Sequence, residues 1–215
     1  ASLTSSSGRS MVFDTRADGF VRGEGCMAGV LQAADEVAAS NVSGSAVRQD
    51  GKSASLTAPN GGAQHRLLKA VIADAGGAFD NGVLVESAST GSPLGDPIEM
   101  GAILKSTLDA AAVVGGIKAN VGHTESASGA IGFAKLLGSL RRSVAAPNAQ
   151  LRALGMNVNA ALASSQQPCS MPIQLTDVSA SLDGIVNSFG LGGTIASASL
   201  TVARSVRNHI TVPPC

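Results

Sequence analysis

The sequence of 215 residues contains no tryptophan and no tyrosine, and aromatic residues make up only 2% of it. A hydrophobic core in this chain must therefore be built from alanine, valine, leucine and isoleucine, packed closely around small residues. Charged residues are also scarce, at 14% against about 25% in an average soluble protein. The formal net charge is zero. Because a near-neutral, charge-poor surface favours association, we expect partner proteins to cover much of it.

Several functional classes are excluded by what is missing. No run approaches the about 18 consecutive apolar residues that a membrane-spanning helix needs, and the serine-rich first ten residues lack the apolar stretch of a signal peptide. The 15 basic residues are balanced by 15 acidic ones, which leaves no cationic surface for nucleic acid. The three cysteines are Cys26, Cys169 and Cys215, and the three histidines are His65, His123 and His209. Both sets are too scattered for a disulfide framework or a zinc site, so we expect no bound metal.

Apolar strand-like runs alternate with amphipathic segments along the chain. Within 23–34 we expect a buried strand that starts at 23 and runs into a helical or linker stretch. The other expected strands lie at 82–87, from 113 within 113–121, and twice within 184–203, around a turn at 190–193. The expected helices lie at 63–75, 97–112 and 129–141, whereas 38–62 and 145–167 are expected to be loop or irregular. This alternation predicts an α/β layered fold in a single domain. The run Asp96-Pro97-Ile98-Glu99 predicts a helix start with Asp96 as the N-cap.

Five segments in unbroken order resemble the signatures of β-ketoacyl synthases of the polyketide-synthase type. They are FDTRADGFVRGEG at 13–25, GSAVRQDGKSASLTAPNGGAQ at 44–64, VESASTGSPLGDPIE at 85–99, IKANVGHTE at 117–125 and VNSFGLGGTIA at 186–196. The resemblance implies the C-terminal half of a thiolase-like layered α-β-α fold, with a mixed sheet and helices on both faces. It also implies one partial ketosynthase domain over 1–215, in which 1–34 ends the first half and 35–215 forms the second.

The chemistry that this resemblance implies needs a nucleophilic cysteine and two histidines. The family's cysteine lies upstream of the 13–25 segment, and none of the cysteines present aligns with it. The first histidine position is occupied by Ala88, which has no donor and no titratable group. The second histidine is kept as His123, with Lys118 five residues before it. A thiolate and fixed donors for an enolate oxygen are what such a condensation requires, so part of the machinery is missing.

Substrate contacts also carry over from the resemblance, residue by residue. Thr90 and Ser92 stand where the family contacts the pantetheine arm of an acyl carrier, and Phe189 and Leu191 stand at its acyl gate, where Leu191 replaces an aromatic residue. We expect one vestigial pocket, lined by Ala88, Thr90, Ser92, Lys118, His123 and Leu191. No cofactor is implied beyond a pantetheine-linked acyl carrier. From its residue type alone, His123 could equally be a buried histidine satisfied by its neighbours.

Three functions remain open at this point. The first is a catalytically inactive ketosynthase-like chain with a structural or scaffolding role. The second is an acyltransferase of the β-ketoacyl synthase family, as half of a split ketosynthase that a cysteine-bearing chain completes and that transfers acyl groups without condensing them. The third is an acyl-carrier or acyl-chain binding module.

The expected partners follow from the apolar helix at 129–141. If its outer face, including some of Ile131, Phe133, Leu136 and Leu137, were left in water, burial worth ~25 cal/mol per Å² would be lost. We therefore expect an obligate protein partner: a homologous ketosynthase half, a second copy or a larger assembly. An acyl carrier protein is a further candidate, and the expected location is intracellular, in cytoplasm or plastid.

Overall fold

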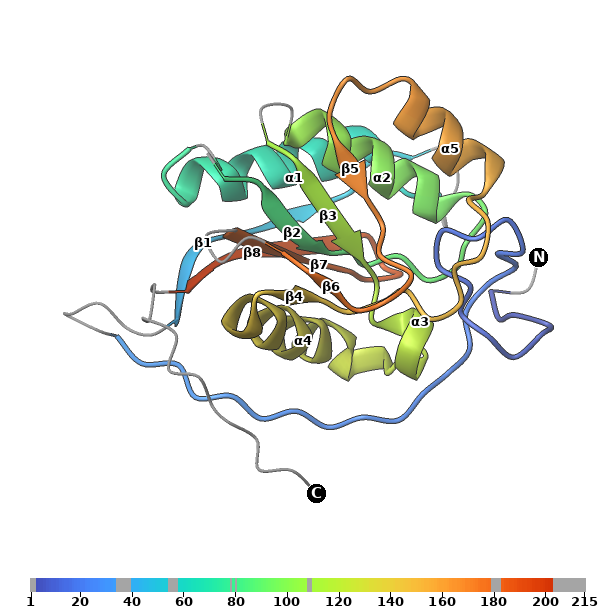
Figure 1. Cartoon of the computed structure of the whole chain (residues 1–215), viewed down its shortest axis with the longest axis horizontal. Helices are drawn as coiled ribbons and strands as arrows, with labels where there is room; N and C mark the ends of the chain where they lie inside the picture. The colour runs from blue at the N-terminus through green and yellow to red at the C-terminus, as the bar shows by residue number, and fades with distance from the viewer. Residues whose placement is uncertain are drawn as a thin grey trace.

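The computed structural model describes residues 3–33, 40–53, 58–77, 79, 81–107, 110–178 and 183–202. Its centre is a six-stranded mixed sheet with the order β1-β8-β7-β2-β3-β5 (Figure 1). These strands are β1 (Ser40–Gln49), β2 (Val83–Glu86), β3 (Ala112–Gly115), β5 (Cys169–Ser170), β7 (Asp183–Phe189) and β8 (Thr194–Val202). The pairs β7/β2, β2/β3 and β3/β5 are parallel, whereas β1/β8 and β8/β7 are antiparallel. Strands β4 (Val144–Ala145) and β6 (Thr176–Asp177) form a separate two-stranded ladder.

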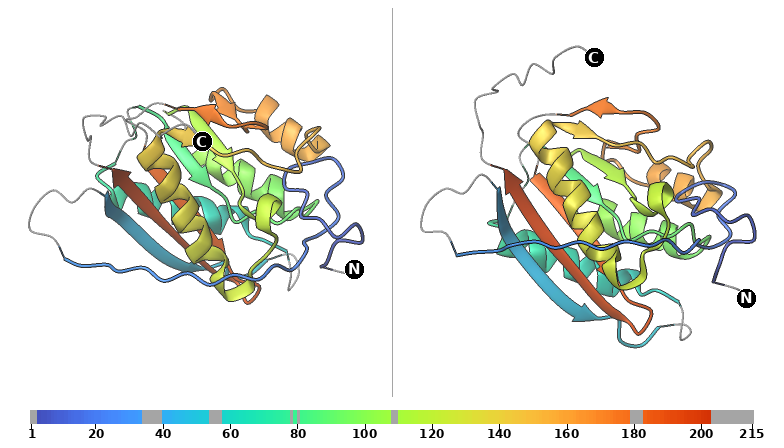
Figure 2. Two further views of the ribbon diagram at one scale, coloured as in Figure 1. Left: turned by 60° about the horizontal axis from the view of Figure 1, so that its bottom comes forward. Right: turned by 90° about the horizontal axis from the view of Figure 1, so that it is seen from below.

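Helices cover both faces of the six-stranded sheet (Figures 1 and 2). Helices α1 (Gly61–Asp74) and α2 (Gly95–Ser106) lie on one face, with α5 (Met156–Ala163) packed against α2. Helix α4 (Ser128–Arg142) lies on the other face, against β7, β2 and β8. The short elements α3 (Lys118–Val121) and η1 (Glu125–Ala127) connect β3 to α4. This is the layered α/β fold, mixed sheet included, that the sequence predicts.

The central strands explain why the core divides in two. All four residues of β2 are buried, as is typical of parallel strands covered on both faces. Val83 and Val85 join the core cluster under α1 and α2, while Leu84 joins the cluster under α4. Successive side chains of a strand point to opposite faces, so this short run of apolar residues holds both helix layers in place.

Four of the five expected strand starts join this sheet, and the fifth does not. Residues 23–33 are extended but form no strand in the described part of the chain, so the expectation of a buried sheet strand there is wrong, and residue 34 lies outside the described residues. The expected loop at 38–62 instead contains β1, and α1 begins at Gly61. Pairing with β8 along its length overrides the weak strand propensity of this Ser- and Gly-rich run.

Two further helix predictions need correction. The stretch expected to be irregular at 145–167 contains α5, a helix of eight residues whose one buried side chain is Val158. Helix α2 begins at Gly95, so Asp96 lies inside its first turn and is not the N-cap. Its carboxylate points instead to the preceding loop, where backbone N–H groups are its partners.

Helix α4 presents less apolar surface outward than we expected. Leu136 is 1% exposed because it packs against the sheet, and Phe133 and Leu137 are half-buried beside it. The exposed positions on its apolar part are Ala130 and Ala134. The outer face of α4 is therefore a surface of small side chains rather than of large ones.

Candidate functional site

Three loops meet at one edge of the sheet. Strands β7, β2 and β3 are parallel neighbours, so the segments that follow them emerge at the same edge. These segments are the loop 87–94 after β2, the stretch 116–123 after β3, and the turn 190–193 after β7. Each of them carries residues from the predicted site.

Ala88 is held by its backbone at the start of the first loop. Its N–H donates to Oε1 of Glu99 over 2.8 Å, and its carbonyl oxygen accepts a hydrogen bond of 2.8 Å from Nζ of Lys118. Glu99 also accepts hydrogen bonds from the hydroxyl of Ser89 and from Nδ2 of Asn187 in β7. All five residues are buried, so a buried hydrogen-bond network holds the backbone of a residue whose side chain is only a methyl group.

Lys118 is 6% exposed, which is unusual for a lysine. Burial lowers the pKa of Lys118, while the carboxylates of Glu99, Glu86 and Asp96 favour its charged form. A lysine in this position neutralises part of the negative charge that the three carboxylates bring into the core. It also fixes the distance between the β2 loop and the start of α3.

Asp96 organises the rest of the first loop. Its carboxylate accepts hydrogen bonds from the backbone N–H groups of Phe13, Thr90, Gly91 and Ser92. Burial raises the pKa of Asp96 to about 6, although these hydrogen bonds favour the carboxylate. The predicted pantetheine contacts therefore sit on a loop whose backbone is fixed from inside.

The hydroxyl of Ser92 already has a partner in its own loop. It accepts a hydrogen bond of 3.0 Å from the backbone N–H of Gly95, at the start of α2. This contact satisfies one of the free N–H groups at a helix N-terminus, which gives Ser92 a structural role beside the predicted one. Thr90 is half-buried, and its assignment as a substrate contact stays a prediction.

The backbone of His123 is hydrogen-bonded to the segment at 13–25, which is called the N-terminal segment below. Its N–H donates to the carbonyl oxygen of Val21 over 2.7 Å, and its carbonyl oxygen accepts from the N–H of Gly23 over 2.9 Å. The imidazole lies against the ring of Phe20, with 4.8 Å between the ring centroids. The segment at 13–25 and the segment at 117–125 thus form one unit around the histidine.

The hydrogen bonds of the imidazole determine which nitrogen carries its proton. Nδ1 of His123 accepts a hydrogen bond of 3.0 Å from the backbone N–H of Glu125 and lies 3.1 Å from the hydroxyl of Ser128. Because a backbone N–H can only donate, the neutral ring must carry its proton on Nε2. Glu125 adopts a left-handed φ of 52°, a costly conformation for a residue with a side chain that directs its N–H to this ring. Burial and the charge of Lys118 lower the pKa of His123.

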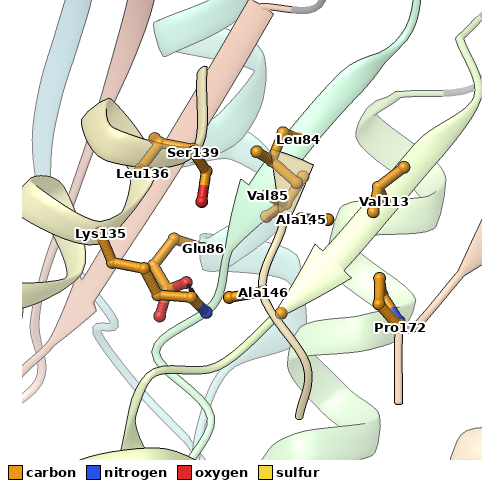
Figure 3. Close-up of a pocket in the computed structure, with 11 residues that line it drawn as sticks. Leu84, Val85, Glu86, Val113, Lys135, Leu136, Ser139, Ala145, Ala146 and Pro172 are labelled. Carbon is orange, nitrogen blue, oxygen red and sulfur yellow. Dashed lines mark hydrogen bonds and ion pairs between the residues drawn. The ribbon is translucent and has the colours of Figure 1, made fainter. Parts of the chain in front are cut away.

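A partly buried ion pair under α4 was not anticipated from the sequence. Nζ of Lys135 lies 2.6 Å from Oε2 of Glu86, and the two side chains extend toward one another in Figure 3. Oε1 of Glu86 also accepts a hydrogen bond of 2.5 Å from the N–H of Ile117. The cavity beside this pair has a volume of about 10 Å³, which is at most the space for one water molecule. The signal in the sequence was Lys135, a charged residue inside the apolar run of α4.

A second, open cavity of about 220 Å³ lies between the segment at 13–17, the junction of the loop after β2 with α2 at 92–97, and the start of α5. Ser92 and Asp96 line it, whereas Ala88, Lys118, His123 and Leu191 do not. The structure therefore brings Lys118 to Ala88 and places the charge of Lys118 near His123, without a described cavity shared by all six predicted residues.

The two predicted gate residues differ in their surroundings. Phe189, at the end of β7, packs against a core cluster that contains Leu67 and Ile195. Leu191 is 69% exposed in the following turn. Their assignment to an acyl gate stays a prediction.

Neither described cysteine lies in the network around Ala88. Cys26 is exposed in the extended segment, and burial raises the pKa of Cys169 in β5 to about 11, which disfavours the reactive thiolate. Cys215 lies outside the described residues. Within the described ranges, no three His, Cys, Asp or Glu side chains are grouped to hold a metal ion. No helix among those described has the length and apolar character to cross a membrane.

The sequence matches the family described as "Beta-ketoacyl synthase, C-terminal domain" over residues 39–152. The highly reducing polyketide synthase alnA of Emericella nidulans is 34% identical over 213 residues, which cover 92% of this chain and 8% of that protein. The mycocerosic acid synthase-like polyketide synthase of Mycolicibacterium smegmatis is 35% identical over 155 residues, covering 69% of this chain and 7% of that protein. This chain belongs to the β-ketoacyl synthase family.

Solved ketosynthase structures share the fold. The ketosynthase from module 6 of the Bacillus subtilis bacillaene synthase superposes with a TM-score of 0.81 at 24% identity, covering 94% of this chain and 38% of that one. The oxazolomycin ketosynthase domain OzmH KS7 of Streptomyces albus gives a TM-score of 0.79 at 24% identity, covering 93% of this chain and 37% of that one. The ketosynthase-like chain thus spans well under half of the solved domains it matches, and a small part of its polyketide synthase relatives.

Proposed function

We propose that this ketosynthase-like chain does not condense acyl groups by itself and acts as a structural or scaffolding component of an assembly of fatty-acid or polyketide synthase type. The observation that carries the proposal is Ala88. Its backbone is fixed by Glu99 and Lys118, so the loop keeps a defined shape, yet its side chain offers no donor for a developing oxyanion. The loop after β2 keeps its structure but lacks a side-chain hydrogen-bond donor at position 88. This combination supports a structural role for the chain rather than a role in condensation.

We also propose the division into parts that the family resemblance implies. Residues 1–34 would end a first ketosynthase half, and residues 35–215 would form the second. Support comes from the backbone: the described residues from 40 onward include every strand of the six-stranded sheet, whereas residues 23–33 join none.

The test is decarboxylation of a malonyl-carrier thioester by the purified chain. The expected rate equals that without protein. Turnover that disappears in a His123→Ala variant, but survives in a His65→Ala control, would contradict the proposal. His65 is a suitable control because it lies on α1, where its Nδ1 meets the hydroxyl of Ser106.

A second candidate is half of a split ketosynthase that transfers acyl groups without extending them. The orientation of His123 favours this candidate. The N–H of Glu125 donates to Nδ1 and so fixes the ring with its proton on Nε2. Such an Nε2–H is a preorganised hydrogen-bond donor. Mass spectrometry of the native complex separates the two functions. An associated chain with a ketosynthase cysteine, acylated in a way that depends on His123, would support the second candidate against the first.

A further inference from the structure

Three exposed cations lie together on the outer helices α1 and α2. Arg66 and Lys69 belong to α1, and Lys105 belongs to α2, which packs beside α1 on the face of the sheet opposite α4 (Figure 1). Arg66 and Lys69 are three residues apart and so share one side of α1. The imidazole of His65 lies among the cations, and burial together with these three positive charges lowers its pKa. The three cations and His65 are called the basic surface below.

A contact between the two helices fixes the geometry of the basic surface. Nδ1 of His65 lies 2.9 Å from the hydroxyl of Ser106, and this hydroxyl donates to the carbonyl oxygen of Ala102 over 2.7 Å. Because the only proton of the hydroxyl goes to Ala102, the imidazole donates from Nδ1. Gly101 lies four residues before Lys105 on α2, and a Cβ atom there would meet nothing within 4 Å. The described chain therefore leaves the helix surface beside Lys105 open.

No carboxylate of the described residues forms an ion pair with these cations. Helix α2 contains Asp96 and Glu99, but both are buried and accept hydrogen bonds in the interior. Asp74, at the C-terminal end of α1, accepts a hydrogen bond from the backbone N–H of Ser45. Like charges on one side of a helix repel one another and lower its stability. An oppositely charged partner would relieve this repulsion.

We propose that the basic surface is a docking site for an acidic segment of a partner polypeptide. Exposed cations that are grouped without carboxylates attract and orient a partner of opposite charge. The carboxylates of such a segment accept charge-assisted hydrogen bonds from arginine and lysine. The inference goes beyond the proposed function, because it uses neither the network around Ala88 nor the surroundings of His123.

Other occupants fit the basic surface less well. In the whole sequence the only adjacent acidic residues are Asp35 and Glu36, so a second copy of the chain offers no acidic run. Polybasic segments that bind anionic membranes carry clusters of about four to eight cations, which is more than the basic surface has. Nucleic acid requires a larger cationic footprint than a chain with 15 basic and 15 acidic residues provides.

Fluorescence anisotropy tests the proposal with the full chain. The probe is a short fluorescein-labelled peptide in which glutamate and alanine alternate, and the control peptide has glutamine in place of glutamate. At low salt the chain should bind the acidic peptide at least about tenfold more tightly than the control peptide. Sodium chloride at about 1 M should remove most of this difference, because the Debye length then falls to about 3 Å. Equal affinity for the two peptides, or binding to phosphatidylserine vesicles without binding to the acidic peptide, would overturn the proposal.

Charge removal locates the binding site. The triple variant Arg66→Gln/Lys69→Gln/Lys105→Gln should bind the acidic peptide about tenfold more weakly than the parent, because three exposed ion pairs are lost. Glutamine has nearly the helix propensity of lysine and arginine, so the circular dichroism spectrum should be unchanged. The signals of the His65 ring should shift when the acidic peptide is added to the parent, whereas those of His123 should not. An acidic peptide that binds without shifting the His65 signals would place its site elsewhere and overturn the proposal.

A matched control separates the basic surface from net charge. The variant Arg9→Gln/Arg142→Gln/Arg152→Gln also removes three exposed cations, from positions outside α1 and α2. It changes the net charge by the same amount, yet its affinity for the acidic peptide should stay within about twofold of that of the parent. Equal losses in the two triple variants would show that net charge alone drives binding, and would overturn the proposal. None of these outcomes changes the decarboxylation result, so the two proposals fail separately.

Discussion

The ammonium group of Lys118 donates a hydrogen bond of 2.8 Å to the backbone oxygen of Ala88. This contact joins the loop after β2 to the helix after β3, and it does so in the interior, among the carboxylates of Glu86, Asp96 and Glu99. The lysine therefore stabilises the fold whether or not the domain is catalytic.

Replacing this lysine tests that role. Lys118→Met should lower the free energy of unfolding by about 3 kcal/mol, because a buried acceptor and buried carboxylates lose their cation. Urea denaturation measures the change, with Lys69→Met on the exposed side of α1 as the control, expected within about 0.5 kcal/mol of the parent. Equal effects of the two substitutions would show that the buried lysine does not hold the loop.

Asp14 should make the stability of the chain sensitive to acid. Its buried carboxylate loses solvation, but the hydrogen bonds from Arg16 and from the backbone N–H groups of Arg152, Arg16 and Ala153 outweigh this, so its pKa lies well below its usual value. A carboxyl group whose pKa is depressed by folding contributes stability above its unfolded pKa of about 3.9 and loses it as the pH falls through the folded pKa.

The corresponding experiment compares the parent with Asp14→Asn from pH 7 to pH 2. At neutral pH the variant should be less stable by roughly 2–4 kcal/mol, since an amide nitrogen would face backbone donors. The difference should narrow below about pH 4, where the carboxylate of the parent begins to lose its contribution. A constant difference across this range, measured by urea denaturation, would count against a depressed pKa for Asp14.

The layered fold could be predicted because its central elements have strong periodic patterns. Strand β2 is a continuous apolar run, and α1 and α4 carry one apolar side each. Strand β1 could not be predicted because serine, glycine and asparagine have weak strand propensity, and its pairing with β8 is a long-range contact that no local pattern reveals. Helix α5 could not be predicted because eight residues with one buried side chain provide little periodicity.

The site could be predicted only as far as motifs identify positions. The juxtaposition of Lys118 with Ala88 follows from neighbouring parallel strands, which the alternation of elements implies. The partners of buried charges do not follow from spacing: Glu86 pairs with Lys135, 49 residues away. The pattern at 23–34 indicates an apolar, extended segment, but no neighbouring strand for it exists in the described chain. A local apolar pattern indicates that a segment favours burial, but it does not identify the elements that bury it.

Gly23 controls the attachment of His123 to the N-terminal segment. A Cβ atom at this position would lie 2.2 Å from the backbone oxygen of Val121. The backbone at Val121 cannot move away without breaking the nearby pairing between Arg22 and His123. Gly23→Ala should therefore lower the free energy of unfolding by about 2 kcal/mol and shift the NMR signals of the His123 ring. Gly192→Ala is the matched control, because a Cβ atom there would have no neighbour within 4 Å. An unperturbed imidazole in Gly23→Ala would show that the pairing does not position it.

His123 should titrate below the ordinary histidine range and keep its proton on Nε2. Burial is the main reason for its lowered pKa, and the charge of Lys118 adds to it, while Glu125 acts in the opposite direction. Nitrogen-15 NMR should show the Nε2–H tautomer at pH 7, because the N–H of Glu125 donates to Nδ1.

The Lys118→Met variant should raise the pKa of His123, because it removes a neighbouring positive charge. The same variant should leave the pKa of His65 unchanged, because the cations near His65 are Lys69, Lys105 and Arg66. Since the pKa of His123 falls on folding, its neutral form stabilises the fold above about pH 6.5, and this contribution is lost as the pH falls through the folded pKa. An Nδ1–H tautomer would contradict the hydrogen bond from Glu125 to Nδ1. An unchanged pKa of His123 in Lys118→Met would contradict the influence of the lysine charge on the ring.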